Sequence, residues 1–389
     1  MSQQRCSNGD VVLLYAHPSA QHLARQIEIL CDKGPEVLSN NGVVVSGSPP
    51  APSSLSASPA KRPAVNQFKR AFSSPESFDL VGRASFLKAR HVEFRNTIQW
   101  KKFADGFPNV FIEDVKYMAG KDVIFIGSFH SPAVVFEQLS VLYAFPRYLA
   151  RSFHFILPYF PTGTMERVDT EGQIATAKTL ATLLSAIPLS AKGPAQIIIY
   201  DIHALQERFY FSDNVIPRLE TAIPLLHSKL SLLENQGENL AIAFPDDGAY
   251  KRFHLLFPGE EEKLIICAKR RMEGNKRIVT VKDGDPKGKH VVIVDDLVQT
   301  GGTLQECGKA LLQGGATAIS AYVTHAVFPN QSWKKFTHSD EGTPPAFANF
   351  WITDSLPHAP EICAHQPFRL LSLSSIIAEN LLGFDLMPS

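Results

Sequence analysis

The sequence predicts an α/β protein built from two tandem domains of similar size, each a mainly parallel sheet flanked by helices. Short apolar runs rich in β-branched residues alternate with segments of helical spacing along most of the chain, which is the order typical of parallel strands joined by crossover helices. The alternation starts again near residue 213, and 389 residues are enough to bury two cores. Together these observations predict a pair of domains.

The elements expected in the first half begin with a strand and a helix close to the N-terminus. Between two later strand-like runs, the Asp105-Gly106 pair is a hairpin signal. In chain order we expect a strand at 11–16, a helix at 22–30, a strand at 91–96, the hairpin, a strand at 121–128, a helix at 133–145, a strand at 153–160, a helix at 174–184 and a strand at 196–200.

Between residues 39 and 88 the composition changes abruptly. No Asp or Glu occurs from Val37 to Pro75, Ser and Pro dominate residues 46–59, and several Lys and Arg make the segment basic. Such a segment buries too little apolar surface to offset the entropy that it would lose on ordering. We therefore expect a disordered insertion at 39–88.

The second half repeats the pattern of strands and helices. Its Gly-rich, charged tract at 272–289 favours a mobile loop. The expected elements are a helix at 217–232, strands at 240–244, 264–268, 291–294 and 318–324, and a closing helix at 371–382. The expected domains are the start of an N-terminal α/β domain at 1–38, the insertion at 39–88, the rest of that domain at 89–215, a C-terminal α/β domain at 216–370, and a C-terminal helix at 371–389 that packs back on the N-terminal domain.

Charge and composition narrow the class of function. The 38 Lys and Arg balance the 38 Asp and Glu, so no electrostatic attraction favours nucleic acid or an anionic membrane surface. No apolar run has the length of a membrane span, and no targeting signal is recognised. The five cysteines have no CxxC spacing, which favours free thiols over zinc sites. We expect a cytoplasmic enzyme without nucleic-acid or membrane partners.

Residues 289–304 combine a buried strand, two carboxylates and a Thr-Gly-Gly-Thr turn. An apolar run at 291–294 is followed by Asp295 and Asp296, and the turn at 300–303 leads into a helical pattern. The glycines let backbone N–H groups face inward, and the helix dipole adds positive potential, so the turn can hold a phosphate. The carboxylates suit sugar hydroxyls or magnesium. The stretch predicts a binder of a phosphorylated sugar; the alternative is a surface loop whose acids cap the next helix.

Charged side chains follow four of the expected strands, at the sheet edge where ligands collect in parallel sheets. One cluster alone is ordinarily a helix cap or a solvated turn, and an isolated His203 would as readily be a structural histidine. Four clusters together favour a shared polyphosphate site. They are Asp201 with His203, Asp246 with Asp247, Lys269 with Arg271, and Asp295 with Asp296.

Longer motifs resemble those of a known family. The 289–304 stretch is similar to the phosphoribosyl pyrophosphate loop of type I phosphoribosyltransferases and ribose-phosphate diphosphokinases. The motifs at 129–141, 158–167, 201–211 and 243–254 span both expected domains. With them the chain resembles a ribose-phosphate diphosphokinase of the plant-like, phosphate-independent branch. The resemblance implies two tandem phosphoribosyltransferase-like domains.

The resemblance also implies an activity. It is transfer of the diphosphoryl group of ATP to the anomeric hydroxyl of ribose 5-phosphate, giving 5-phosphoribosyl 1-diphosphate and AMP for nucleotide biosynthesis. A Mg2+ cofactor and a homo-oligomer with an ATP site between subunits are implied as well. The alternatives are a phosphoribosyltransferase, which would leave the upstream half without a role, and a catalytically silent regulatory homologue that assembles with active subunits.

Individual roles are implied by the same motifs. Lys269 and Arg271 match the catalytic cations that stabilise charge on the phosphates. The ATP site is matched by Arg167, Asp169 and His203, with Phe103 and Asp105 from a neighbouring subunit. Ribose 5-phosphate is matched to Asp295, Asp296, Thr300, Gly301, Gly302 and Thr303, the diphosphate loop to Asp246, Asp247 and Gly248, and magnesium to His203 and Asp246. Thr164 and Met165 stand where the bacterial and animal branch has an Arg-Gln pair, and Phe107 stands where it has an acid.

Overall fold

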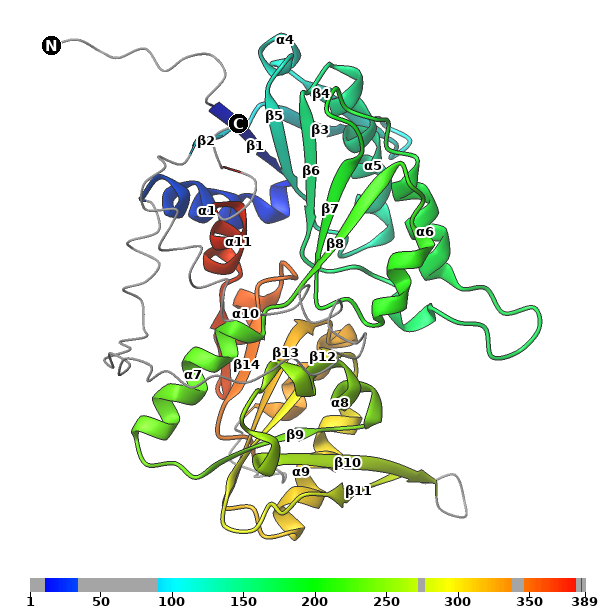
Figure 1. Cartoon of the computed structure of the whole chain (residues 1–389). Coiled ribbons are helices and arrows are strands. Elements are labelled where there is room, and N and C mark those ends of the chain that lie inside the picture. Colours follow the sequence, from blue (N-terminus) through cyan, green and yellow to red (C-terminus); the bar gives the residue numbers. More distant parts are fainter. Residues whose placement is uncertain (1–10, 34–89, 272–276, 338–345, 383–385, 387–389) are drawn as a thin grey trace, which may run out of the picture.

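The computed structural model describes residues 11–33, 90–271, 277–337, 346–382 and 386 (Figure 1). The insertion expected at 39–88 lies outside the described residues and stays a prediction. Each half of the chain forms a sheet flanked by helices, and the two halves lie one above the other in Figure 1. The predicted fold class, two tandem domains with mainly parallel sheets, is confirmed.

The first sheet contains six strands in the order β2-β1-β5-β6-β7-β8, and every neighbouring pair is parallel. The strands are β1 (Val11–Ala16), β2 (His91–Phe94), β5 (Asp122–Ile126), β6 (Ser152–Leu157), β7 (Ala195–Tyr200) and β8 (Val215–Glu220). Its helices are α1 (Gln21–Lys33), α5 (Pro132–Arg147) and α6 (Thr176–Ser185). Short helical turns are η1 (Pro18–Ala20), α4 (Val115–Met118), η3 (Gly163–Met165) and η4 (Leu205–Tyr210).

The strands of this sheet are apolar on both faces because helices cover both. In β1, Leu13 and Tyr15 belong to the core under α5 and α6, whereas Val12 and Leu14 belong to the core under α1. All four side chains are buried. Continuous apolar runs of this kind are typical of a parallel sheet that is covered on both sides, which is why the sequence revealed them.

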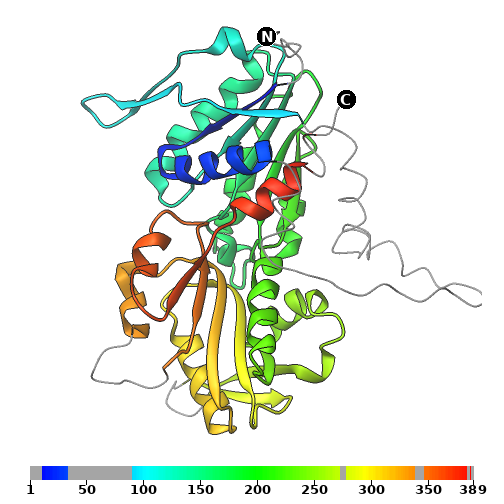
Figure 2. The ribbon, with the colours of Figure 1, turned by 90° about the vertical axis from the view of Figure 1, so that its left-hand side faces the viewer.

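The expected hairpin is formed by β3 (Ile98–Lys102) and β4 (Pro108–Ile112), which pair antiparallel. Its turn requires a positive φ, and Gly106 supplies it at 89°. The backbone N–H of Phe103 donates to the carbonyl oxygen of Phe107 at 2.9 Å and closes the turn. The hairpin projects from the body of the first half (Figure 2).

The prediction of a helix at 217–232 is wrong at its N-terminal end. Residues 217–220 belong to strand β8, and the helix α7 runs Ile223–Asn235. β8 is the last strand of the sheet, and an edge strand tolerates Pro217 because one side of its backbone needs no partner. The first sheet therefore extends to Glu220, beyond the domain boundary expected at 215/216.

The second sheet contains seven strands in the order β11-β10-β9-β12-β13-β14-β15; the β10–β11 pair is antiparallel and the other pairs are parallel. The strands are β9 (Leu240–Phe244), β10 (Leu264–Arg271), β11 (Arg277–Asp283), β12 (His290–Val298), β13 (Ala318–Ala326), β14 (Phe350–Thr353) and β15 (Phe368–Leu371). Its helical segments are α8 (Asp247–Phe253), η5 (His254–Leu256), η6 (Glu261–Lys263), α9 (Gly302–Gln313), η7 (Pro329–Phe336) and α10 (Ala359–Cys363).

The prediction of a mobile loop at 272–289 is wrong for residues 277–283, which form β11. β10 continues past its expected end to Arg271 and pairs antiparallel with β11. Residues 272–276 lie outside the described part of the chain. The charged composition of the tract suggested a loop, but alternation on an edge strand produces a similar composition.

The strand expected at 291–294 continues through both carboxylates to Val298. Its backbone stays in register with β13 as far as the Val298–Ala326 pair. No element was expected between β13 and the closing helix, where the structure has η7, β14, α10 and β15. The two strands are short, and short strands give little periodicity to detect.

Helix α11 (Ser374–Asn380) returns to the first half and lies against α1 (Figure 1). Ile376 and Ile377 share a core with Leu23 and Ile27 of α1. The helix begins later than the 371–382 segment expected, because Leu371 belongs to β15, and residues 381 and 382 continue it as a π-helical turn.

Composition also led to expectations about membrane-spanning segments and about the cysteines. No helix in the described part of the chain is both long and apolar enough to cross a membrane. Free thiols were expected, and Cys31, Cys267, Cys307 and Cys363 are free. Cys6 lies outside the described residues.

Candidate active site

The two halves meet at the carboxyl ends of β7 and β12. His203 follows β7, and Asp296 lies near the end of β12. Nδ1 of His203 is 2.8 Å from Oδ2 of Asp296, although 93 positions separate them in sequence. The imidazole is partly exposed and the carboxylate is buried. This contact brings together two of the four charged clusters predicted at strand ends.

Further hydrogen bonds join the halves behind this contact. The hydroxyl of Thr324 donates to Oδ2 of Asp201 at 2.7 Å, and Nε2 of His325 lies 3.0 Å from the carbonyl oxygen of Tyr200. Asp201 also accepts from the backbone N–H of Ala222 at 2.9 Å. Asp201, which the sequence placed in a ligand cluster with His203, therefore serves to fasten the two halves.

His203 and Asp296 each stabilise the charged form of the other. The hydrogen bond to Asp296 raises the pKa of His203, although burial opposes the rise. Burial would raise the pKa of Asp296, but the hydrogen bond with His203 and the charge of Arg252 together hold it below its usual value. The pair therefore favours an imidazolium that faces a carboxylate.

Asp295 is in a different electrostatic environment from its neighbour. Burial, together with the charges of Asp296 and Asp246, raises the pKa of Asp295 well above its usual range. Three carboxylates from two strand ends thus crowd one region, as the sequence predicted for Asp246, Asp295 and Asp296.

The two acids of the expected diphosphate loop, Asp246 and Asp247, have different contacts. Oδ1 of Asp246 accepts from the backbone N–H groups of Gly248 at 3.1 Å and Ala249 at 3.0 Å, so Asp246 caps helix α8. Asp247 is exposed, and its Oδ1 lies 2.7 Å from Nζ of Lys282 on β11. Asp246 therefore contributes charge to the carboxylate cluster, whereas Asp247 forms an ion pair at the surface.

A magnesium ion fits the chemistry of this cluster. Among the residues that the structure describes, no group of three or more His, Cys, Asp or Glu side chains is arranged to hold a metal. Magnesium needs no such group, because it usually keeps several waters and binds one or two carboxylates together with substrate phosphates. The repulsion that raises the pKa of Asp295 would be relieved by a divalent cation.

The Thr-Gly-Gly-Thr turn opens helix α9, as predicted. Gly301 stands at the N-cap with a φ of 74°, and a Cβ at this position would lie 2.5 Å from the ring of Phe336. Thr300 and Gly302 are exposed and Thr303 is half-buried. Gly301 has no side chain to cap the helix, so the amides of the first turn of α9 can face an anion.

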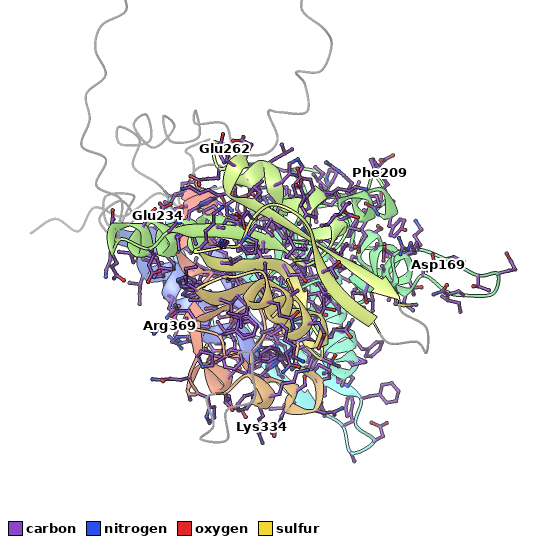
Figure 3. The ribbon with its side chains drawn as sticks, turned by 90° about the horizontal axis from the view of Figure 1, so that it is seen from below. Asp169, Phe209, Glu234, Glu262, Lys334 and Arg369 are labelled. Carbon is purple, nitrogen blue, oxygen red and sulfur yellow. The ribbon has the colours of Figure 1, made fainter. Side chains whose placement is uncertain are left out.

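The ATP-side residues lie on exposed segments. Asp169 is on a loop that projects from the body of the protein (Figure 3). Nε of Arg167, whose side chain is 75 % exposed, lies 3.4 Å from Oδ1 of Asp169. Phe103 and Asp105 are exposed on the β3–β4 hairpin.

Lys269 and Arg271 lie on strand β10 and not on a loop. In the antiparallel register with β11, Lys269 is opposite Val279 and Arg271 is opposite Arg277. Their side chains fall outside the described part of the structure.

Two charged residues with buried side chains at this site were not predicted from the sequence. Nη1 of Arg252 lies 3.9 Å from Oδ2 of Asp296. Glu207, four positions after His203, is fully buried, and its burial raises the pKa to about 7. Glu207 lies in the 201–211 motif and Arg252 in the 243–254 motif. No feature of the sequence distinguishes them from solvated charges, because their burial depends on the tertiary fold.

Comparisons with known proteins agree with the geometry. The family model of the "N-terminal domain of ribose phosphate pyrophosphokinase" matches residues 88–187, and that of the "Phosphoribosyl transferase domain" matches residues 218–355. "Ribose-phosphate pyrophosphokinase 4" of Oryza sativa subsp. japonica is 55 % identical over 290 residues, which are 73 % of this chain and 87 % of that protein. The chain belongs to the ribose-phosphate pyrophosphokinase family.

A second relative supports this assignment, and a solved structure has the same fold. "Ribose-phosphate pyrophosphokinase 3, mitochondrial" of Spinacia oleracea is 51 % identical over 312 residues, 80 % of this chain and 75 % of that protein. The phosphoribosylpyrophosphate synthetase of Mycobacterium smegmatis has the same fold, with a TM-score of 0.65 and 19 % identity over 95 % of this chain and 97 % of that one. The predicted family is confirmed, and with it the enzyme class. Because relatives include a mitochondrial form, the cytoplasmic location stays a prediction.

Proposed function

We propose that the chain transfers the diphosphoryl group of ATP to the anomeric hydroxyl of ribose 5-phosphate, forming 5-phosphoribosyl 1-diphosphate and AMP. The observation that carries this proposal is the 2.8 Å contact between His203 and Asp296. It joins a residue that follows β7 of the first half to a residue of β12 in the second half, which supports adjoining sites for ATP and the sugar phosphate. A transfer between two bound substrates requires that their sites adjoin.

The sugar phosphate binds at the end of β12. The carboxylates of Asp295 and Asp296 accept hydrogen bonds from ribose hydroxyls, because ionised carboxylates are acceptors only. Thr300, Gly301, Gly302 and Thr303 hold the 5-phosphate against the first turn of α9. The exposure of Thr300 and Gly302 is consistent with this role.

ATP binds across the other half. Arg167, Asp169 and His203 contact it from this chain, and Phe103 and Asp105 contact it from a neighbouring subunit of a homo-oligomer. The β3–β4 hairpin projects from the body (Figure 2), as a segment that reaches a second subunit would. The transferred diphosphate lies over Asp246, Asp247 and Gly248.

Charge develops on the phosphoryl oxygens during the transfer. Lys269 and Arg271 stabilise it from β10. Asp246 would hold Mg2+ together with His203, which would bind it through Nε2 after loss of the proton there, because Nδ1 faces Asp296. The bound ion would neutralise the triphosphate. In phosphoryl-group transfer such electrostatic stabilisation and positioning supply most of the catalysis. No nucleic acid or membrane takes part, and the enzyme acts in the cytoplasm.

AMP formation from ATP tests the proposal. The protein is incubated with ATP, with and without MgCl2, with and without ribose 5-phosphate, and across a titration of inorganic phosphate. AMP that appears only with magnesium and the sugar phosphate would support diphosphoryl transfer, and full rate without phosphate would place the enzyme in the phosphate-independent branch. A folded protein that forms no AMP under any of these conditions would contradict the proposal and favour the catalytically silent homologue.

A further inference from the structure

Arg252 is a buried cation beside the His203–Asp296 pair. Its side chain is 9 % exposed, and Nη1 lies 3.9 Å from Oδ2 of Asp296. This separation makes an ion pair but is too long for a hydrogen bond. Among the described residues, Nη1 of Arg252 has no hydrogen-bond acceptor.

The guanidinium is held in place by its surroundings. Its Cζ lies 5.0 Å from the centre of the Phe253 ring, a distance at which a cation is attracted to an aromatic face. Arg252 comes from helix α8, which begins directly after Asp246. Its charge also acts on His203 and Glu207 of the first half. The cation therefore lies where both halves of the site meet.

Charge balance alone does not explain this arrangement. An arginine that served only to neutralise Asp296 would be expected to form the short, two-pronged hydrogen bonds that guanidinium and carboxylate groups favour. A buried N–H without an acceptor costs about 1–3 kcal/mol. Nη1 is shielded from solvent as well as unpaired, so a phosphoryl oxygen that reached it would supply the acceptor that the protein does not.

We propose that Arg252 is a further substrate-binding residue, whose free N–H donates to a phosphoryl oxygen of the transferred diphosphate while its charge orients Asp296. This inference rests on the proposed diphosphoryl transfer. Arg252 would approach the diphosphate from a different element than Lys269 and Arg271. It lies on α8, whose first residues belong to the diphosphate loop, whereas they lie on β10. It would contact the diphosphate from the side of the sugar site.

Two substitutions of Arg252 separate this role from a structural one. Arg252→Lys keeps the charge and loses the planar fork, and Arg252→Met keeps the apolar stem and loses the charge. Lys251→Met is the matched control, because Lys251 is the preceding residue of α8 and is exposed. Circular dichroism and thermal unfolding establish that each variant is folded.

Calorimetric titration with pyrophosphate plus MgCl2 and, separately, with ribose 5-phosphate gives the decisive comparison. We expect Arg252→Lys to weaken pyrophosphate binding at least about 10-fold and to lower kcat/KM for ATP on the order of 100-fold, with ribose 5-phosphate binding changed less than about 3-fold. Lys251→Met should match the wild type. Unchanged pyrophosphate binding, equal weakening for both ligands, or unfolding of both variants would overturn the inference. Wild-type protein that binds pyrophosphate yet forms no AMP would contradict the proposed function alone.

Discussion

Glu207→Gln should change how the stability of the protein depends on pH. The Glu207 side chain is 0 % exposed. Its Oε1 accepts from the backbone N–H of Ala204 at 3.0 Å, and Oε2 has no hydrogen-bond partner among the described residues. Burial raises its pKa from the usual 4.5 to about 7. The folded chain therefore holds a proton on Glu207 at pH values where the unfolded chain has released it.

The sign and size of the effect follow from this difference. A raised carboxyl pKa contributes stability that is fully present below pH 4.5 and is lost as the pH rises through 7. At about 1.4 kcal/mol for each pH unit, the rise corresponds to about 3 kcal/mol of unfolding free energy. Gln does not titrate and can still accept from Ala204, so the variant lacks this loss.

Urea unfolding followed by circular dichroism at pH 5 and pH 8.5 measures the effect. The stability of Glu207→Gln relative to wild type should increase by about 2.5 kcal/mol between the two pH values, because a small part of the loss has already occurred at pH 5. Glu171→Gln makes the same chemical change at an exposed position and should show no such increase. A pH dependence that is the same in wild type and in Glu207→Gln would refute the conclusion that Glu207 is buried and protonated.

Two further predictions concern the Thr-Gly-Gly-Thr turn and strand β10. Gly301→Val should lower the unfolding free energy by more than the about 1–3 kcal/mol expected from a positive φ alone, because its Cβ would meet the Phe336 ring. Gly288→Val is the control, because Gly288 has a φ of 71° and open space around it. Urea unfolding of this variant gives the loss of unfolding free energy that the backbone alone causes. Equal losses of unfolding free energy in the two variants would contradict the close contact with Phe336. Lys269→Ala and Arg271→Ala should lower kcat far more than the affinity for ribose 5-phosphate; steady-state kinetics and titration that show equal losses would exclude a role for them in the transition state.

The sequence predicted those parts of the fold that depend on local pattern. The apolar runs of β1, β5, β7 and β12 could be recognised because both faces of a parallel sheet are covered. Because ligands gather at strand ends, the sequence also indicated that His203 and Asp296 belong to one site. The order of the strands then brings these residues together across 93 positions.

The remaining features depend on contacts between distant segments. Strand β8 was mistaken for the start of a helix, since nothing local shows that Pro217 lies at a sheet edge. The burial of Arg252 and Glu207 is a property of the folded chain, so an exposed charge and a buried one have the same sequence signal. The use of Asp201 to fasten the halves is likewise a property of the tertiary fold.

Phosphorus NMR of the reaction mixture tests the central claim that this site moves a diphosphoryl group between its two halves. With ATP, MgCl2 and ribose 5-phosphate, we predict that the ATP resonances are replaced by those of AMP and of a diphosphate attached to the anomeric carbon of the sugar. Appearance of ADP with a sugar bisphosphate would show transfer of a single phosphoryl group and would contradict the account. Unchanged ATP in the presence of folded protein would contradict it as well.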